Sequence, residues 1–244
     1  MKHIKVIAMI LMCFASTCAY AGEDTIRIST SYKTLLSTPD QTGMLDQIVK
    51  EAFRRIGIKS RIVFTPNERS LVAVNDGMFD AEINRVAGME KKFPNLIQVP
   101  EANMVMHFVS FATKDISITD WESLRSLKVG IVRGWKILEQ NTQGFPYVTR
   151  VMNADQLFLM LHKGRIDVAL FSKILGYEWI SNLDCDHVQH LEPPLASRGM
   201  FLYLHKNHQQ LAIPVAEALR EMKRDGTYDR IVQKTTGFLY GSSE

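Results

Sequence analysis

The segment Asp76-Gly77-Met78-Phe79-Asp80-Ala81 joins the end of a predicted helix to the start of a predicted strand, and the fold that we expect follows from it. Lys163-Gly164-Arg165-Ile166-Asp167-Val168 repeats this order of helix end, glycine, two residues, aspartate and strand in the second half of the chain. Two similar α/β lobes would produce such a repeat. A helix end followed by a strand is also a common combination, so the repeat alone leaves both interpretations open.

Strands and helices alternate along the rest of the chain. Apolar spacing predicts strands at 26–29, 61–64, 79–84, 128–132, 147–151 and 166–171. It predicts helices at 44–56, 70–75, 135–141, 153–163 and 208–224, with a last short helical segment opened by Gly226-Thr227-Tyr228. This alternation predicts an α/β protein with largely parallel sheets.

The composition is that of an ordinary globular protein. The chain has 244 residues, of which 46% are hydrophobic and 23% are charged, and its formal net charge is +3. It has no cluster of Lys and Arg of the kind that binds nucleic acid. No apolar stretch reaches the length of a membrane-spanning helix. We therefore expect no nucleic-acid partner and no stable membrane insertion.

Residues 1–21 have the pattern of a secretory signal peptide. Lys2 and Lys5 flank the start of a short apolar run, and Ala19-Tyr20-Ala21 has the small-x-small pattern that signal peptidase cuts after. Cleavage there removes two of the three cysteines and brings the net charge close to neutral. Cys185 then has no partner for an internal disulfide, so we expect an exported, disulfide-free protein.

Four motifs, in order along the chain, resemble those of the family 3 extracellular solute-binding proteins, the periplasmic receptors of polar amino-acid ABC transporters. They are Thr42-Gly43-Met44-Leu45-Asp46-Gln47-Ile48 with Ile56-Gly57, the segment 71–81, Gly164-Arg165-Ile166-Asp167-Val168-Ala169, and Glu221-Met222-Lys223-Arg224-Asp225-Gly226-Thr227-Tyr228-Asp229. Together they span nearly all of the chain that follows residue 21.

This resemblance implies two α/β lobes joined by two crossing hinge strands, with a ligand cleft between the lobes. It places lobe 1 at 22–109 and 201–244, lobe 2 at 110–200, and the hinge near 107–111 and 199–201. It also implies a periplasmic monomer that closes around a small-molecule ligand and hands it to an ABC permease. We expect no cofactor and no metal, because Asp184-Cys185-Asp186-His187, with His190 nearby, lacks the ligand spacing of a zinc site.

Open α/β sheets bind ligands just beyond the carboxyl ends of their strands. The predicted strand ends are rich in charged and aromatic residues, and our candidate ligand contacts are Tyr32, Glu68, Arg69, Glu82, Asn84, Arg85, Arg133, Trp135 and Ser172. The arginines are suited to clamping a carboxylate, and the aromatic rings to stacking on a flat or cationic group. The two glutamates would balance a ligand amine or hold the arginines. The alternative is that these charges form solvated ion pairs without a binding role.

The amino-acid clamp of the resembled family is not retained. Those receptors carry Gly-x-Thr-x-Thr-x-x-Arg after the third strand, whereas this chain has Arg85-Val86-Ala87-Gly88-Met89-Glu90-Lys91-Lys92. Ser172 falls where they carry an aspartate for the α-amino group, and Arg133-Gly134-Trp135-Lys136 replaces their Ser-Gly-Thr-Gly loop. We therefore expect a small polar ligand that is anionic or amino-acid-like, with no support for an ordinary α-amino acid.

Two other functions fit the same scaffold. Some relatives of the resembled family are periplasmic cyclohexadienyl dehydratases, in which a cleft carboxyl group acts as general acid. Glu82 or Glu68 would serve in that role if burial raised its pKa. A receptor that senses a ligand without transporting it is the third possibility. We expect a non-enzymatic binding protein, because only the fold analogy supports the enzyme.

Overall fold

The computed structural model describes residues 25–182 and 187–240, apart from the side chains of Asn67, Glu68 and Tyr240. The predicted signal peptide, most of the predicted Asp184-Cys185-Asp186-His187 segment, and the side chain of Glu68 therefore lie outside the described residues. No helix in the described ranges is both long enough and apolar enough to cross a bilayer.

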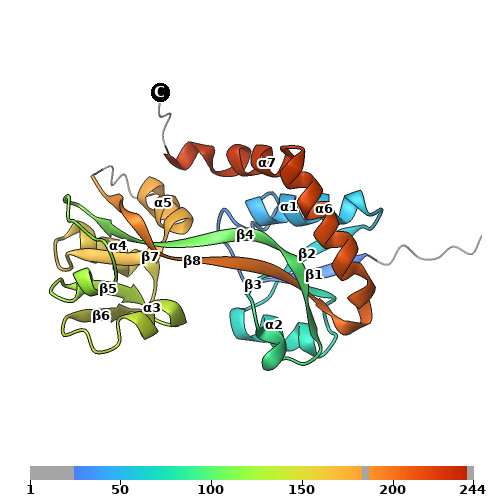
Figure 1. Ribbon diagram of the computed structural model, residues 1–244, viewed down its shortest axis with the longest axis horizontal. Coiled ribbons are helices and arrows are strands. Elements are labelled where there is room, and N and C mark those ends of the chain that lie inside the picture. Colours follow the sequence, from blue (N-terminus) through green and yellow to red (C-terminus); the bar gives the residue numbers. More distant parts are fainter. Residues whose placement is uncertain (1–24, 183–186, 241–244) are drawn as a thin grey trace, which may run out of the picture.

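The described strands form one sheet of eight in the order β2-β1-β3-β8-β4-β7-β5-β6. The shorter strands are β1 (Ile26–Thr30), β2 (Ser60–Phe64), β3 (Ala81–Val86), β5 (Val129–Val132), β6 (Val148–Val151) and β7 (Val168–Ser172). The two long strands, of 17 residues each, are β4 (Leu96–Ala112) and β8 (Gln189–His205). Figure 1 shows that these long strands run through both lobes and connect them.

Each lobe contains three parallel strands, and β4 and β8 pair antiparallel between the two sets. In the first lobe β8 pairs with β3 as far as Met200, which lies opposite Val86. In the second lobe β4 pairs with β7 from Phe108, which lies opposite Ser172. Between these positions the sheet narrows to β4 and β8 alone, with the pairs Val105 to Gly199, Met106 to Arg198 and His107 to Ser197. The predicted hinge segments 107–111 and 199–201 each overlap this two-stranded ribbon at one end.

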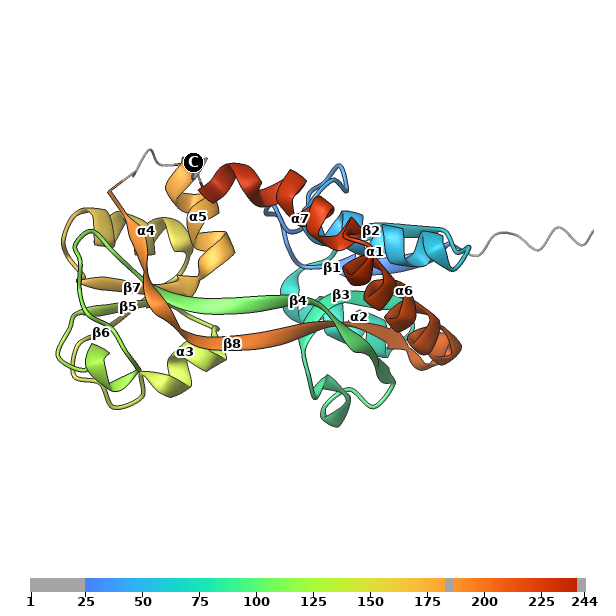
Figure 2. The same cartoon turned by 45° about the horizontal axis from the view of Figure 1, so that its top comes forward.

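Helices pack against the sheet in both lobes (Figures 1 and 2). The helices of the first lobe are α1 (Met44–Arg55), α2 (Asn67–Asn75), α6 (Ala212–Arg224) and α7 (Thr227–Thr236). Those of the second lobe are α3 (Lys136–Asn141), α4 (Ala154–His162) and α5 (Lys173–Asn182). Short 3₁₀ turns lie at Met89–Lys91, Glu122–Leu124, Lys206–Leu211 and Gly237–Tyr240. The apolar faces predicted for α1 and α6 are the faces that each helix buries.

The structure resolves the two interpretations of the sequence repeat, because the two aspartates make the same contacts. In the first lobe, Arg27 N–H donates to Asp80 Oδ2 over 2.8 Å, and Asp80 N–H donates to the Arg27 carbonyl over 2.9 Å. In the second lobe, Lys128 N–H donates to Asp167 Oδ2 over 2.7 Å, and Asp167 N–H donates to the Lys128 carbonyl over 2.8 Å. Each aspartate thus ties its own strand to the first strand of its lobe.

The glycines of the repeat are also equivalent. Gly77 and Gly164 both have a positive φ, 75° and 64°, and each lies between a helix and the next strand of its lobe. Glycine adopts this left-handed conformation without the steric penalty that a Cβ atom brings. Two similar α/β lobes, and not a chance recurrence, therefore account for the repeat.

Asp46 holds together the loop that leads from β1 into α1. Its side chain is fully buried and accepts hydrogen bonds from Ser37 Oγ at 2.7 Å, Thr38 N at 2.9 Å and Gly43 N at 3.0 Å. A Cβ atom on Gly43 would lie 2.7 Å from the Leu36 carbonyl, so the loop passes too close to the helix start for a larger residue. The carboxylate and the glycine together fix this loop, which begins next to Tyr32.

We predict that Asp46→Ala lowers the free energy of unfolding by roughly 3 kcal/mol, because the change leaves three donors without their charged acceptor. Urea denaturation measures this loss. Asp40→Ala is the control, since Asp40 is exposed in the same loop and its removal should change stability by less than about 0.5 kcal/mol. Equal effects of the two substitutions would show that the Asp46 hydrogen bonds contribute little.

Candidate functional site

The carboxyl ends of the parallel strands in the two lobes point toward each other. β8 runs from the second lobe to the first, and β3 is antiparallel to it, so β3 and its parallel neighbours end on the side of the second lobe. β7 is antiparallel to β4 and ends at Ser172, on the side of the first lobe. The residues that follow these strands therefore gather at the junction of the lobes, which is where α/β sheets bind ligands.

Among the contacts of Arg85, at the end of β3, are hydrogen bonds to Glu82 and Ser31. Its Nε donates to Glu82 Oε1 over 2.8 Å, and its Nη2 donates to Ser31 Oγ over 3.3 Å. The register between β3 and β8 shifts between Glu82 and Arg85, an irregularity of the kind that redirects a side chain out of the strand pattern. The Arg85 side chain is 17% exposed, so a guanidinium group of fixed orientation reaches the surface at the lobe junction.

Glu82 lies beneath Arg85 and is fully buried. It accepts a second hydrogen bond from Ser70 Oγ, which is also hydrogen-bonded to Ser29 Oγ at 2.7 Å. Burial raises the pKa of the Glu82 carboxyl group, and the charge of Arg85 opposes that rise. The sequence left two roles open for this residue. Because Glu82 is fully buried and its two oxygens already accept hydrogen bonds from Arg85 and Ser70, the geometry favours the role of holding Arg85 over contact with a ligand amine.

Tyr32 and Asn84 form a second pair at the same junction. Asn84 Nδ2 donates to the Tyr32 hydroxyl over 3.2 Å and lies 3.6 Å from Met104 Sδ. Burial raises the pKa of the Tyr32 hydroxyl. Asn84 Oδ1 is buried and has no hydrogen-bond partner in the described part of the chain. A buried acceptor of this kind requires a donor, which a ligand or a water molecule would supply.

The second lobe contributes Trp135 and Ser172, and both are neighbours of Phe108. The Trp135 ring packs edge-on against Phe108 at 5.7 Å between centroids and tilted against Phe171 at 4.9 Å. Ser172 pairs with Phe108 in the sheet, and its hydroxyl is buried without a hydrogen-bond partner in the described ranges. Trp135 is half-buried, so part of its ring remains available for contact.

Arg69 and Arg133 are not held by the other predicted contact residues that the structure describes. Both are exposed, Arg69 on α2 and Arg133 directly after β5. Within the described residues, neither donates a hydrogen bond to another predicted contact residue. The structure therefore brings six of the predicted residues into two groups, whereas these two arginines make no described contact with either group. The six are Glu82, Arg85, Tyr32 and Asn84 in the first lobe, and Trp135 and Ser172 in the second.

Sequence reasoning missed a polar chain at the start of α5. Lys173 Nζ and His190 Nε2 each lie 2.9 Å from Glu192 Oε1, and the Tyr177 hydroxyl lies 2.5 Å from His190 Nδ1. Lys173 pulls the pKa of Glu192 below its ordinary value. Lys173 directly follows a predicted strand end, which was the available signal. Its partners on β8 could not be foreseen from their position in the sequence.

A hydrogen bond between the lobes was also missed. Leu35 N–H, in the loop after β1, donates to Glu178 Oε1 of α5 over 2.8 Å. Glu178 Oε2 is buried and has no partner among the described residues. Burial raises the pKa of this carboxyl group. Glu178 therefore links the two lobes beside the ribbon.

We predict that the free energy of unfolding of Glu178→Gln increases relative to that of the wild type as the pH rises. The variant keeps an oxygen acceptor for Leu35 but carries no charge. Burial raises the folded-state pKa of Glu178 above the ordinary 4.5. The stability that the protonated carboxyl group of the wild type contributes is therefore fully present below pH 4.5, and it is lost as the pH rises through the folded-state pKa. Urea denaturation at several pH values from about 4 to 8 measures the difference.

Glu221→Gln is the matched control, because Glu221 is an exposed glutamate on α6. Its stability difference from the wild type should stay nearly constant over the same pH range. A Glu178→Gln difference that is equally constant would contradict the assignment of a raised pKa to Glu178.

Solved structures identify the class of fold. The chain is similar to the probable amino-acid ABC transporter extracellular-binding protein ytmK from Bacillus subtilis, with a TM-score of 0.73, 17% identity and coverage of 88% of this chain and 98% of that one. It is also similar to an ancestral cationic amino acid solute-binding protein, AncCDT-1, with a TM-score of 0.71, 20% identity and coverage of 87% and 95%. The fold is that of the periplasmic binding proteins, as the sequence motifs predicted.

Sequence comparisons give two further relatives. The histidine-binding periplasmic protein of Escherichia coli is 23% identical and aligns with 98% of this chain and 99% of its own. An uncharacterized protein of Shewanella oneidensis is 28% identical over 198 residues, 77% of this chain and 74% of that protein. No protein-family model matches the chain. The resemblance to solute-binding proteins is therefore confirmed, whereas the loss of the amino-acid clamp remains a prediction.

Proposed function

We propose that this protein is a periplasmic solute-binding protein that captures a small anionic or amino-acid-like metabolite between its lobes for import by an ABC permease. The fold and the relatives support an amino-acid-binding periplasmic protein in general terms. The observation that carries the more specific proposal is the fixed guanidinium group of Arg85 at the carboxyl end of β3.

Arg85 is suited to a carboxylate because of how it is held. Glu82 binds its Nε from below and Ser31 accepts from Nη2, so the side chain pays little entropy when a ligand binds. A guanidinium group can donate two parallel hydrogen bonds to a carboxylate, which gives geometric specificity as well as charge attraction. The unpartnered Asn84 Oδ1 lies on the same strand and is suited to a ligand N–H or O–H group.

The second lobe would complete the site when the lobes close. Trp135 supplies a partly exposed aromatic surface, Arg133 a cation and Ser172 a hydroxyl group. A ligand favours the closed arrangement only through contacts with both lobes. The proposed hinge is the two-stranded ribbon at 105–107 and 197–199, because the smallest number of hydrogen-bonded strands must bend there. The lobe boundaries predicted from the resemblance, 22–109 and 201–244 for lobe 1 and 110–200 for lobe 2, lie close to this ribbon, although Phe108 already pairs with β7 of the second lobe and Met200 with β3 of the first.

A thermal-shift screen of amino acids, dicarboxylates, aromatic acids and polyamines tests this function. A ligand present at 100 times its dissociation constant adds about 2.7 kcal/mol of stability. We expect at least one carboxylate-bearing compound to raise the melting temperature, and we expect that shift to depend on Arg85. A screen in which no carboxylate gives a shift would remove the support for capture of a common metabolite.

Substitutions at Arg85 test its role as the carboxylate contact. We predict that Arg85→Lys weakens binding of the identified ligand about tenfold or more, because lysine keeps the charge but cannot make two parallel hydrogen bonds. Arg85→Ala should abolish binding. It also leaves Glu82 buried without its cation, so its stability must be measured separately. Calorimetry gives both affinities.

Arg61→Ala is the control, since Arg61 is an exposed arginine on β2. Its ligand affinity should equal that of the wild type. Wild-type affinity in Arg85→Lys and in folded Arg85→Ala would place the carboxylate contact elsewhere.

A dehydratase-like enzyme is the second candidate, and the raised pKa of Glu82 favours it. One solved neighbour, AncCDT-1, is described as a precursor of cyclohexadienyl dehydratase. Glu82 is fully buried and occupied by Arg85 and Ser70, which leaves a substrate no direct path to it in this arrangement. Incubation with prephenate or arogenate, followed by detection of the aromatic product, separates the two functions. Product formation that Glu82→Gln abolishes would establish the enzyme.

The third candidate function is a receptor that senses a ligand without transporting it. The chain is similar in fold to a histidine kinase sensor domain, with a TM-score of 0.69 and 16% identity over 88% of this chain and 97% of that one. That similarity concerns the fold alone, and the same scaffold serves both purposes. Ligand binding as tested above is common to both roles.

A further inference from the structure

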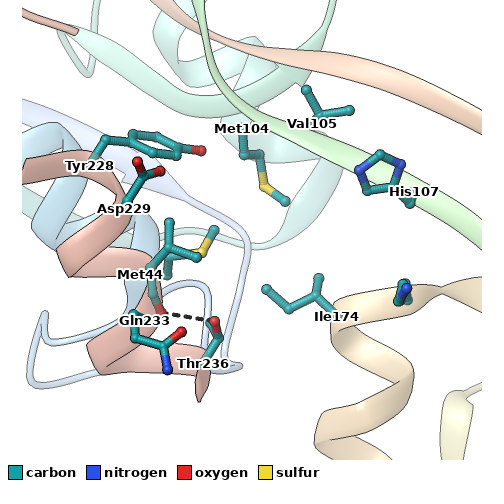
Figure 3. A pocket seen from close by; sticks show the side chains of 11 residues that line it. Met44, Met104, Val105, His107, Ile174, Tyr228, Asp229, Gln233 and Thr236 are labelled. Atoms are coloured by element: carbon teal, nitrogen blue, oxygen red, sulfur yellow. Dashed lines mark hydrogen bonds between the residues drawn. The ribbon is translucent and has the colours of Figure 1, made fainter. Parts of the chain in front are cut away.

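A cavity of about 360 Å³ lies beside the β4–β8 ribbon, on the side where α5 and α7 lie (Figures 1 and 3). Its walls come from α1 and α7 of the first lobe, from β4, and from the start of α5 in the second lobe. Within the described residues, its lining includes none of the predicted contacts at the strand ends. The volume falls in the range of small-molecule sites.

The interior of this cavity is mainly apolar and adaptable. Met44 and Met104 contribute side chains that are almost fully buried, and Figure 3 shows both beside the cavity with Ile174 facing them from α5. Methionine side chains are flexible and polarizable, so they can adjust to occupants of different shape. Tyr228 and Val232 of α7 extend the same wall.

The charged side chain of the described lining that has no ion-pair partner among the described residues is a carboxylate. Asp229 is exposed and makes no ion pair within the described residues. It lies in the first turn of α7. Lys173 is the one lysine or arginine in the lining that the structure describes, and Glu192 already pairs with it at 2.9 Å. In the described lining, an occupant therefore meets an apolar interior and one carboxylate that is not paired with a lysine or arginine.

We propose that this cavity is a second ligand site, for an organic monocation with a short apolar body such as a primary alkylamine. The ammonium group pairs with Asp229, and the apolar body packs against Met44, Met104 and Ile174. Charge complementarity favours the cation, since the lysine of the described lining already pairs with Glu192 whereas Asp229 has no such partner among the described residues. The proposal of this second site does not depend on the function proposed for the strand ends.

Occupation of this second site affects the arrangement of the lobes. Asp229 and Met44 belong to the first lobe, whereas Ile174 belongs to the second, so an occupant contacts both and stabilises the arrangement that forms the cavity. Met104 Sδ lies 3.6 Å from Asn84 Nδ2, which places the cavity one contact away from the strand-end residues. The coupling between the two sites is reciprocal if both ligands depend on the lobe arrangement.

The test uses the chain that follows the predicted signal peptide, residues 22–244, and three probes of nearly the same size. The probes are pentan-1-amine, pentan-1-ol and pentanoate. Binding is followed by ligand-observed NMR and by calorimetry up to about 20 mM. We expect saturable binding of pentan-1-amine, at least tenfold weaker binding of the alcohol, and none of pentanoate at this site. Equal affinity for the amine and the alcohol, or no saturable binding of the amine, would overturn the proposal.

Two variants locate the amine. Asp229→Asn should weaken amine binding at least tenfold and leave alcohol binding unchanged, whereas the control Glu221→Gln should leave both unchanged. Ile174→Ala should weaken the amine and the alcohol alike, because it removes apolar contact from the second lobe. Melting temperatures of the unliganded variants confirm that each is folded. An Asp229→Asn variant that binds the amine as well as the wild type does would refute the ion pair.

Failure of this proposal and failure of the proposed function are distinguishable. Arg85→Lys should leave pentan-1-amine affinity within about twofold of the wild type in the absence of a strand-end ligand. Amine binding that depends on Arg85 and not on Asp229 would show that the probe occupies the strand-end site, which overturns the second site. Loss of all carboxylate binding with intact amine binding would instead affect only the proposed function.

Discussion

β4 and β8 pair along most of their length, and both halves of the molecule are built outward from that pairing. Each strand has one end embedded in the first set of parallel strands and the other in the second, so the two lobes share a single hydrogen-bonded sheet. The order of the strands also dictates which way the parallel strands point. In the first lobe β3 is antiparallel to β8, and in the second lobe β7 is antiparallel to β4. Because β4 and β8 run in opposite directions, the carboxyl ends of β3 and β7 must face each other. The site at the junction follows from that orientation.

The chemistry at this junction depends on burial as much as on residue type. Glu82 would be an ordinary surface carboxylate if it lay at a strand exit, but it points inward and becomes the support for Arg85. Arg69 and Arg133 carry the same charge as Arg85, yet no such support fixes them in the described structure. A guanidinium group of fixed orientation is worth more to a ligand than a mobile one, because less conformational freedom is lost on binding.

The sequence predicted those parts of the fold that depend on local pattern. The apolar faces of α1 and α6 and the helix-glycine-strand repeat are local features, and the structure bears them out. Helix α5 was missed because its buried residues, Leu175, Gly176 and Ile180, do not form a regular apolar stripe. The strand-end rule located the candidate residues but not their roles. The Glu82–Arg85 pair crosses a register shift, and the Leu35–Glu178 bond joins two lobes, and neither can be inferred from spacing along the chain.

The position of β8 between β3 and β4 also constrains how the chain folds. The Tyr203 hydroxyl donates to the Val86 carbonyl, a bond between residues 117 apart in sequence. The second set of parallel strands lies entirely within this interval, so it can assemble while β3 still has an open edge. Until β8 arrives, that edge offers unpaired backbone groups to any other extended chain. We therefore expect the closing of the first lobe to be a slow step of folding, during which the open edge of β3 favours aggregation.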